Sequence, residues 1–200
     1  MALDKNQVIG HYGEMAFVSS LHDKGWHVYR AYIDENVDFI ITKYICTSCN
    51  KLTELYVDGQ CLTNKCKHCK RDTVDILTKF IQVKTSEGVV KNGNREYSFH
   101  AKLRSNVGPN SYYCWIAVVK KDGKKIPHFY IFHHTEINKF DDLNIDSYQV
   151  TDNQKTAITI NESGIVTKKG RKYSYECFKE FHDNFEKFDP NYKLVPIIKN

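Results

Sequence analysis

The sequence predicts an α/β protein in which a mixed central sheet is flanked by helices and interrupted by a small zinc-binding insert. An amphipathic segment opens the chain, several short apolar runs of strand character follow, and a polar, cysteine-rich stretch separates two of these runs. The 41% apolar and 13% aromatic residues supply a hydrophobic core. With 26% charged residues and four prolines, the composition is typical of a folded chain.

The first element is predicted to be a helix over about residues 5–24. Asp4 stands where an N-cap accepts backbone hydrogen bonds, and Gln7 three residues later completes the pattern of a capping box. Gly25 follows at the position where glycine commonly ends a helix. These signals bound the helix at both ends.

Glu14 lies on the expected buried face of this helix, because Val18 and Leu21 follow it at four and seven residues. A carboxylate in that position is costly without a partner. Helical spacing alone leaves two interpretations open: a boundary residue that reaches water or a lysine, or a functional group.

Five short runs rich in apolar residues predict strands on both sides of the cysteine-rich stretch. The last two are expected to form a hairpin, because Asp122-Gly123 between them is a turn signal. Further on, β structure is expected within residues 146–167, and helices are expected near residues 135–140 and over residues 174–188. The five runs are residues 26–30, 37–41, 79–84, 112–119 and 129–132.

Two CxxC pairs separated by sixteen residues indicate a zinc site. Two residues between thiolates allow both sulfurs of a tight turn to face one centre, and two such turns complete the tetrahedral shell of zinc. Four thiolates leave no position for water, so the site is expected to be structural. Cys61 and His68 are spare potential ligands, whereas Cys114 and Cys177 are interpreted as core residues. The predicted ligands are Cys46, Cys49, Cys66 and Cys69.

The formal net charge of +5 and the pI near 8.7 favour polyanionic partners without identifying one. No apolar run approaches the ~20 residues of a membrane-spanning helix, and the first residues lack the apolar core of a signal peptide. A cytoplasmic protein without membrane contact is therefore expected. In that reducing compartment, clustered cysteines hold metal more often than they form disulfides.

A second, oxygen-rich metal site is predicted around Gln82. Gln82 and Lys84 are two residues apart in a predicted strand, so their side chains project from one face, while Ile81 and Val83 point to the other. Asp38 stands in a neighbouring apolar strand, where a buried carboxylate needs a partner. Mg²⁺ prefers such oxygen ligands.

These residues resemble the PD-(D/E)xK nuclease superfamily. The resemblance depends on Gly13-Glu14 in the first helix, then on Val37-Asp38-Phe39-Ile40 and Ile81-Gln82-Val83-Lys84-Thr85-Ser86 in strands. It looks closest to branches with glutamine in the (D/E) position, such as certain intron-encoded homing endonucleases, and archaeal Holliday junction resolvases share the core plan. It implies a restriction-endonuclease-like core at residues 1–45 and 70–200, with a C-terminal helical and β extension. The zinc-ribbon insert occupies residues 46–69.

The resemblance implies that Asp38, Gln82 and the carbonyl of Val83 bind a catalytic Mg²⁺, with Glu14 as a further acidic ligand. Lys84 would orient or deprotonate the attacking water and stabilise charge on the phosphate. Gln82 departs from the acidic residue of the pattern, because it offers an oxygen without a negative charge. Metal affinity is therefore expected to fall unless Glu14 restores that charge. No organic cofactor is expected.

Two lysine-rich loops are predicted to contact DNA phosphates, which gives salt-dependent affinity without reading the base sequence. One is the tip of the predicted hairpin, and the other precedes the last predicted helix. Each is also typical of a solvated loop. The residues are Lys120, Lys121, Lys124, Lys125, Lys168, Lys169, Arg171 and Lys172.

Together these features predict a Mg²⁺-dependent DNA endonuclease, first of restriction or host-defence type and next of homing or junction-resolving type. Cleavage of two strands with one active site per chain implies a homodimer. The ribbon is inserted between Asp38 and Gln82 and is therefore expected beside the active site, where its basic residues would touch phosphates or face solvent.

Two alternatives stay open. His133-His134, with Asn138 nearby and CxxC pairs upstream, faintly resembles an HNH nuclease site, although the cysteine pairs lie far from it in the sequence. In the second alternative the protein is not an enzyme: a zinc-ribbon protein would use a nuclease-like core only to dock nucleic acid.

Overall fold

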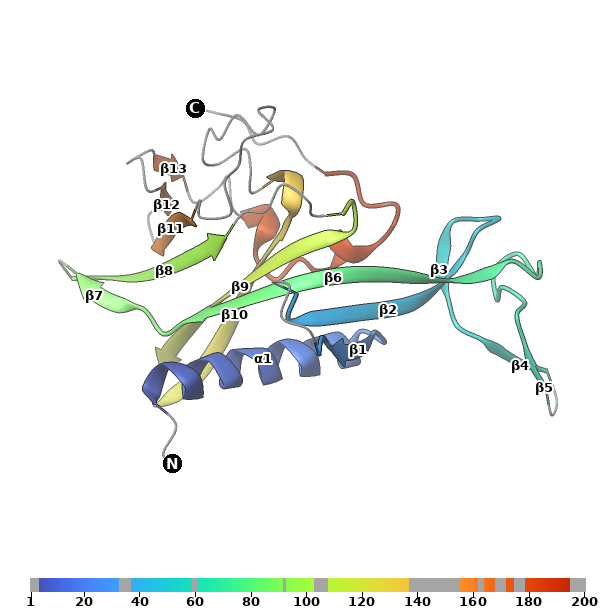
Figure 1. The fold of residues 1–200 in the computed structure, drawn as a ribbon, viewed down its shortest axis with the longest axis horizontal. Coiled ribbons are helices and arrows are strands. Elements are labelled where there is room, and N and C mark those ends of the chain that lie inside the picture. The colour runs from blue at the N-terminus through green and yellow to red at the C-terminus, as the bar shows by residue number, and fades with distance from the viewer. Residues whose placement is uncertain are drawn as a thin grey trace.

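The computed structural model describes residues 4–32, 37–58, 61–91, 93–102, 108–136, 155–161, 164–167, 172–174 and 179–194. Helix α1 (Lys5–Asp23) is followed by strands that form two sheets and one separate pair, and by the short 3-10 helices η2 (Lys179–Phe181) and η3 (Phe185–Phe188) (Figure 1). The strands are β1 (His27–Arg30), β2 (Phe39–Cys46), β3 (Lys51–Thr53), β4 (Tyr56–Asp58), β5 (Cys61–Thr63), β6 (Val74–Ser86), β7 (Val89–Lys91), β8 (Asn94–Lys102), β9 (Ser111–Lys121), β10 (Lys124–His133), β11 (Lys155–Asn161), β12 (Gly164–Thr167) and β13 (Lys172–Ser174).

Helix α1 begins and ends at the predicted signals. The Asp4 carboxylate accepts the backbone N–H of Gln7 at 2.8 Å, and the Gln7 side chain accepts the N–H of Asp4 at 3.0 Å, which completes the capping box. At the other end Gly25 adopts φ +74°, and its N–H donates to the carbonyl of His22.

The central sheet is mixed, as predicted, with the strand order β1-β2-β6-β9-β10, and β3 pairs with β2 outside this order. The pairings are antiparallel except for β6 with β9, which run parallel. Strand β6 bonds to β2 along Val74–Ile81 and to β9 along Phe80–Ser86, so its two halves have different partners. The hairpin β9–β10 turns at Asp122-Gly123, as the sequence predicts.

Helix α1 packs closely on β6 and buries one face of the sheet. Phe17 and Leu21 join the core with Ile81 and Val83, and all four side chains are buried. At Gly13 the approach is tightest: a Cβ there would lie 2.6 Å from Cγ2 of Thr85 and closer still to its hydroxyl. Thr85 therefore points toward α1, as do Ile81 and Val83.

The opposite face of the central sheet is covered by a second sheet, of order β13-β12-β11-β8-β7, where the sequence predicts flanking helices. Phe99 of β8 stacks on Trp115 of β9 with ring centroids 5.4 Å apart and planes 6° apart. Figure 1 shows β8 and β11–β13 on the side of the sheet away from α1. One helix and one sheet thus enclose the central sheet.

The helix predicted over residues 174–188 is wrong for the described part of that range, because Ser174 ends strand β13 and η2 and η3 are separate. β10 is the last strand of its sheet, so its outer backbone groups need partners. The N–H of Asp183 donates to the carbonyl of Phe129 at 2.7 Å, and the N–H of Phe129 donates to the Asp183 carboxylate at 2.8 Å. In this segment, hydrogen bonds to the edge of β10 take the place of the hydrogen bonds of a continuous helix.

A buried ion pair holds the same C-terminal segment (residues 179–194) against the sheet. Nζ of Lys187 lies 2.7 Å from the Glu136 carboxylate, and neither side chain is exposed. The second Glu136 oxygen accepts the N–H of His133 at 2.7 Å, and Lys187 Nζ lies over the ring of Phe181. Burial raises the pKa of Glu136 and lowers that of Lys187, while their mutual contact opposes both changes.

A helical turn begins at His134, but residues 137–140 of the predicted short helix lie outside the described residues. The predicted β structure in residues 146–167 is present as β11 and β12, and residues 146–154 are not described. In the part of the chain that the structure describes, no helix is both long and apolar enough to cross a membrane.

The close contact at Gly13 predicts opposite effects for two glycine substitutions in one helix. Gly13→Ala is expected to destabilise the fold by ~1–3 kcal/mol, because the added methyl group overpacks against Thr85. Gly10→Ala, where nothing lies within 4 Å of the added Cβ, is expected to stabilise it by up to ~1 kcal/mol through helix propensity. Urea unfolding measures both, and a Gly13→Ala protein as stable as Gly10→Ala would contradict this packing.

Candidate functional site

The four predicted zinc ligands form one cluster. All four sulfurs lie within 4.8 Å of one another. Cys46 Sγ lies 3.5 Å from Cys69 Sγ, and Cys49 Sγ lies 3.7 Å from Cys66 Sγ. These distances exceed the ~2.05 Å of a disulfide. They match the roughly 3.8 Å between two sulfurs in a tetrahedral site with Zn–S of ~2.3 Å. The cluster therefore fits a zinc ion.

Each CxxC pair is a backbone turn of the same design. The N–H of Asn50 donates to the carbonyl of Cys46 at 2.8 Å, and the N–H of Lys70 donates to the carbonyl of Cys66 at 2.9 Å. Asn50 and Lys70 both adopt a positive φ, of 52° and 61°. The turns thus direct both sulfurs of each pair toward one point. A hydrogen bond with Thr73 lowers the pKa of the Cys46 thiol, which favours the thiolate.

The expected position of the ribbon beside the active site is wrong. Cys46 ends β2, and Cys69 lies just before β6, whereas Asp38 precedes β2 and Gln82 lies in the second half of β6. Because β2 and β6 run antiparallel, a segment inserted between them lies at the end away from Asp38. Eight residues at ~3.3 Å each separate Asp38 from Cys46 by roughly 26 Å. Figure 1 shows β3, β4 and β5 at that far end.

Asp38 lies just before β2 begins, and its side chain forms a hydrogen bond with the neighbouring strand β6. Its N–H donates to the carbonyl of Ile81 at 2.9 Å, and its carboxylate accepts the N–H of Val83 at 2.6 Å. The other carboxylate oxygen makes no hydrogen bond with the described residues. The β2–β6 ladder ends at Phe39 and Ile81. The two hydrogen bonds of Asp38 hold it beside the chain neighbours of Gln82.

Gln82 carries a buried polar atom without a partner. The residue is 6% exposed, and its Oε1 has no hydrogen-bond partner among the described residues. Leaving a buried acceptor unpaired costs ~1–3 kcal/mol, so such an atom calls for an explanation. A cation is one partner that an amide oxygen accepts. The donor set of Asp38 and Gln82 therefore fits Mg²⁺.

Lys84 shares the face of Gln82 and is half-buried. It makes no hydrogen bond or ion pair with the described residues, so its ammonium group is available to a ligand. Val83 points into the core, which leaves its carbonyl as the only group that it can offer a metal. The structure thus brings Asp38, Gln82, Val83 and Lys84 together at the point where β6 leaves β2.

Glu14 forms an ion pair with an arginine. Its carboxylate pairs with Arg30 at 3.3 Å and makes no hydrogen bond with Asp38 or Gln82. Its side chain is 24% exposed and has an arginine as partner, which fits a boundary residue, and a role as metal ligand stays a prediction. Arg30 ends β1 beside Phe39 and brings a 70% exposed guanidinium to this end of the sheet. No sequence motif identified Arg30.

The lysines at the hairpin tip are partly neutralised by Glu87. Lys120 and Lys125 lie 2.9 and 3.7 Å from its carboxylate, and Lys5 lies 3.3 Å from it. The hydrogen bond with Lys120 holds the pKa of Glu87 far down, at about 2. Lys121 and Lys124 are exposed beside the turn.

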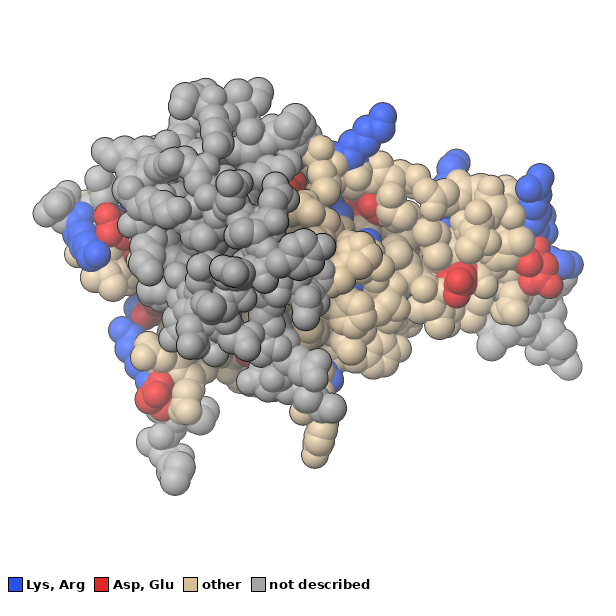
Figure 2. All heavy atoms as spheres, turned by 45° about the horizontal axis from the view of Figure 1, so that its top comes forward, with Lys and Arg blue, Asp and Glu red and all other residues tan. Residues whose placement is uncertain are grey.

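The second predicted lysine cluster lies largely outside the described residues, because Lys168, Lys169 and Arg171 are not described and only the backbone of Lys172 is. Figure 2 shows lysine and arginine side chains gathered at the end of the molecule that carries the four-cysteine segment, mixed with acidic ones. Lys67 there pairs with Glu54 at 3.2 Å. Phosphate contacts in both regions remain predictions.

The HNH alternative has no support in the described residues. Both ring nitrogens of His133 are engaged, Nε2 with the carbonyl of Pro109 and Nδ1 with the hydroxyl of Thr135, each at 2.8 Å. His133 is buried, and burial lowers its pKa. Asn138 lies outside the described residues. His133 therefore has the environment of a core histidine.

No protein-family model and no curated protein sequence matches this chain. Among solved structures, a bacterial homing endonuclease, I-Ssp6803I, is similar with a TM-score of 0.35 and 17% sequence identity. The similarity covers 66% of this chain and 72% of that chain. A similarity this distant establishes neither a shared fold nor a shared function.

The cysteine cluster predicts a tightly held zinc ion. Wild-type protein kept reduced should retain about one such zinc per chain, whereas Cys69→Ser should lose it, because three thiolates and a hydroxyl bind zinc more weakly. Cys114→Ala, at a buried cysteine of the core, should keep its zinc. Metal analysis tests this, and wild-type protein with fewer than ~0.5 zinc per chain would count against a tight site.

Proposed function

We propose that this protein is a Mg²⁺-dependent endonuclease that hydrolyses phosphodiester bonds in DNA. One observation carries the proposal: the buried oxygen of Gln82 has no hydrogen-bond partner among the described residues, and two further groups lie on its strand neighbours. These are the Asp38 carboxylate, bound to the N–H of Val83, and the ammonium of Lys84, on the same strand face as Gln82. A binding module has no need for an unsatisfied oxygen beside a carboxylate. A metal centre explains both groups at once.

In this proposal Asp38, Gln82 and the carbonyl of Val83 hold Mg²⁺. The bound ion would supply a Lewis acid at a phosphate oxygen. The hydrogen bond from Val83 N–H to Asp38 fixes the direction of the carboxylate, in the manner of an outer-shell contact that orients a metal ligand. Glu14 would contribute charge near the site only when Arg30 releases it.

Lys84 would orient the attacking water and, as a neutral amine, accept its proton, or as an ammonium stabilise negative charge on the phosphate. Its side chain lies two residues beyond Gln82 on the same face, so a phosphate at the metal is within reach of its ammonium. Arg30, exposed at the same end of the sheet, is available for a further phosphate contact. The lysines at 120, 121, 124 and 125 would add salt-dependent, sequence-independent affinity.

Restriction-like or host-defence cleavage is the favoured biological setting, and a homodimer would supply the second active site for two-strand cutting. Homing and junction resolution come next. Linear duplex, supercoiled plasmid and four-way junction DNA, incubated side by side with the protein and Mg²⁺ or Mn²⁺, would distinguish these settings by which substrate is cut.

The activity depends on Lys84 in this proposal. Lys84→Ala is expected to lower the rate of plasmid nicking by ~100-fold or more, because a positioned acid–base group and a fixed charge are both lost. Lys193→Ala, at an exposed lysine of the C-terminal segment, is the matched control and should nick as wild type does. Gel analysis of supercoiled plasmid measures the rate.

Equal nicking by wild type and Lys84→Ala, or none by either, would sink the catalytic assignment. DNA binding by both proteins without nicking would favour a non-catalytic zinc-ribbon protein that docks nucleic acid. Gel-shift measurements on the same samples separate these outcomes.

The role of Gln82 in metal binding can be tested without cleavage. Gln82→Glu adds a negative charge, so Mn²⁺ should bind about tenfold more tightly or better, which corresponds to ~1.4 kcal/mol. Gln82→Met removes the oxygen at similar volume and should abolish the metal-dependent rise in melting temperature. If Mn²⁺ stabilises Gln82→Glu no more than Gln82→Met, the Gln82 oxygen is not a metal ligand.

A further inference from the structure

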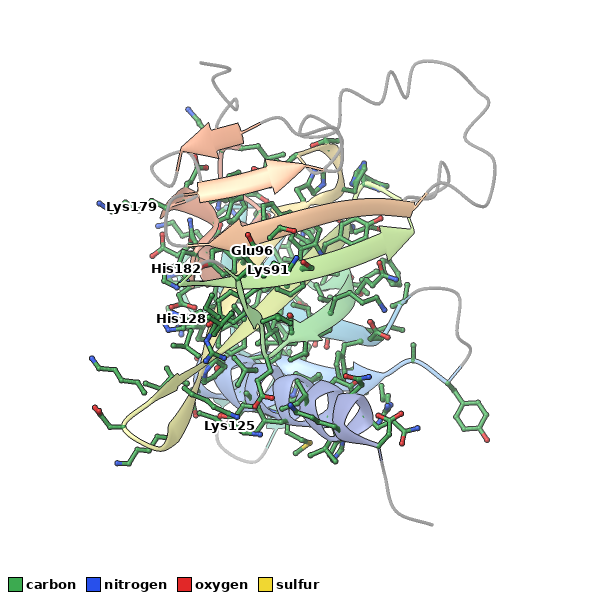
Figure 3. All side chains as sticks on the ribbon, turned by 90° about the vertical axis from the view of Figure 1, so that its left-hand side faces the viewer. Lys91, Glu96, Lys125, His128, Lys179 and His182 are labelled. Atoms are coloured by element: carbon green, nitrogen blue, oxygen red, sulfur yellow. The ribbon has the colours of Figure 1, made fainter. Side chains whose placement is uncertain are left out.

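A third group of metal-ligating side chains lies at the outer edge of β10, outside the two sites already described. His128 Nδ1 lies 2.7 Å from His182 Nε2, and His182 Nε2 lies 3.2 Å from the Asp183 carboxylate. The three ligand atoms all lie within 4.8 Å of one another. His128 and His182 are 54 residues apart in the sequence, and Figure 3 shows them side by side.

The three side chains are held in place by contacts on elements that are themselves fixed. The His182 ring stacks on Tyr130, 5.1 Å away and 17° from parallel, and residue 182 bridges to Tyr130 through the backbone. One Asp183 oxygen is already occupied, because it accepts the N–H of Phe129 at 2.8 Å. That bond directs the other oxygen toward His182.

Protons alone satisfy this group poorly. Whichever ring nitrogen donates between His128 Nδ1 and His182 Nε2, that hydrogen cannot also point at the Asp183 oxygen, 3.2 Å from His182 Nε2. A divalent cation satisfies all three ligand atoms at once.

We propose that His128, His182 and Asp183 form a transition-metal site, with Zn²⁺ as its natural occupant. Two imidazoles and one carboxylate are a ligand set for zinc and similar ions, and Mg²⁺ and Ca²⁺ prefer oxygen ligands throughout. Zinc at ~2.0–2.1 Å from each atom would place neighbouring ligands roughly 3.3 Å apart, so the histidine nitrogens need to separate by only about half an ångström. The 48% exposed Asp183 leaves the fourth position open to water.

This site is distinct from the proposed Mg²⁺ site. Across the sheet, Ser86 of β6 pairs with Ala117 of β9, which pairs with His128 of β10. Two strand spacings put His128 and Ser86 roughly 10 Å apart, whereas two-metal centres need ~3.5–4 Å. The His/His/Asp site would instead pin the C-terminal segment to the edge of β10.

The test is a Zn²⁺ titration by calorimetry of full-length protein whose four-cysteine site is already filled with zinc. Wild type should take up one further zinc per chain. His182→Gln, His128→Gln and Asp183→Asn should each bind it at least tenfold more weakly. Asp183→Asn keeps an oxygen that accepts the N–H of Phe129, so this variant should stay folded. His11→Gln, at an exposed histidine of α1, is the matched control and should bind as wild type does.

Two results would overturn the site: no further zinc taken up by wild type, or undiminished uptake by His182→Gln and Asp183→Asn. Co²⁺ decides the case in which the variants fail to fold. With the cysteine site filled by zinc, Co²⁺ bound to wild type should show ligand-field bands without thiolate charge-transfer absorption. Charge-transfer absorption, or no Co²⁺ spectrum, would count against the site. None of these outcomes depends on nuclease activity.

Discussion

Strand β6 changes its bonding partner near Phe80, and both predicted metal sites follow from that change. Its first half pairs with β2, and the cysteine turns lie at the outer end of that pairing. Its second half pairs with β9, so from Gln82 onward the edge that faced β2 has lost its strand. The Asp38 carboxylate occupies the first position of this gap, at the N–H of Val83. Oxygen ligands thus meet where the sheet opens, while α1 closes the other face through the contact at Gly13.

The features that sequence predicted correctly are those set by residues close together in the chain. The capping box of α1 needs only Asp4 and Gln7, and the hairpin turn needs only Asp122-Gly123. Each cysteine turn closes within five residues, so the spacing of its two cysteines is enough to predict that both sulfurs face one point. Alternation along one strand placed Gln82 and Lys84 on one face for the same reason.

Features that depend on distant pairing were missed. Phe181, Phe185 and Phe188 have helical spacing, yet each ring packs on a different partner, and Asp183 bonds to the edge of β10. The spacing of apolar residues within a short segment does not predict whether that segment will pair with the edge of a sheet. The partner of Glu14 was missed because Arg30 lies in a short strand without a motif. The ribbon was predicted beside Asp38 and Gln82 because it lies between them in the sequence. The antiparallel pairing of β2 with β6 instead puts it at the opposite end of these strands.

The separation of ribbon and site changes what the ribbon can do for a nuclease. At roughly 26 Å it cannot shape the metal centre, but that length equals about eight base pairs at ~3.4 Å each, so one duplex can touch both. The C-terminal segment ties the first cysteine turn to the rest of the fold. Asn191 exchanges two hydrogen bonds with Asn50 of the first cysteine turn, at 2.6 and 2.7 Å, and Lys187 anchors the same segment through its buried pair with Glu136. Removing one partner of a buried pair typically costs ~3–5 kcal/mol, so loss of Lys187 or Glu136 would weaken the attachment of this segment. In the proposed nuclease, the ribbon would thus hold the duplex at a set distance from the cut.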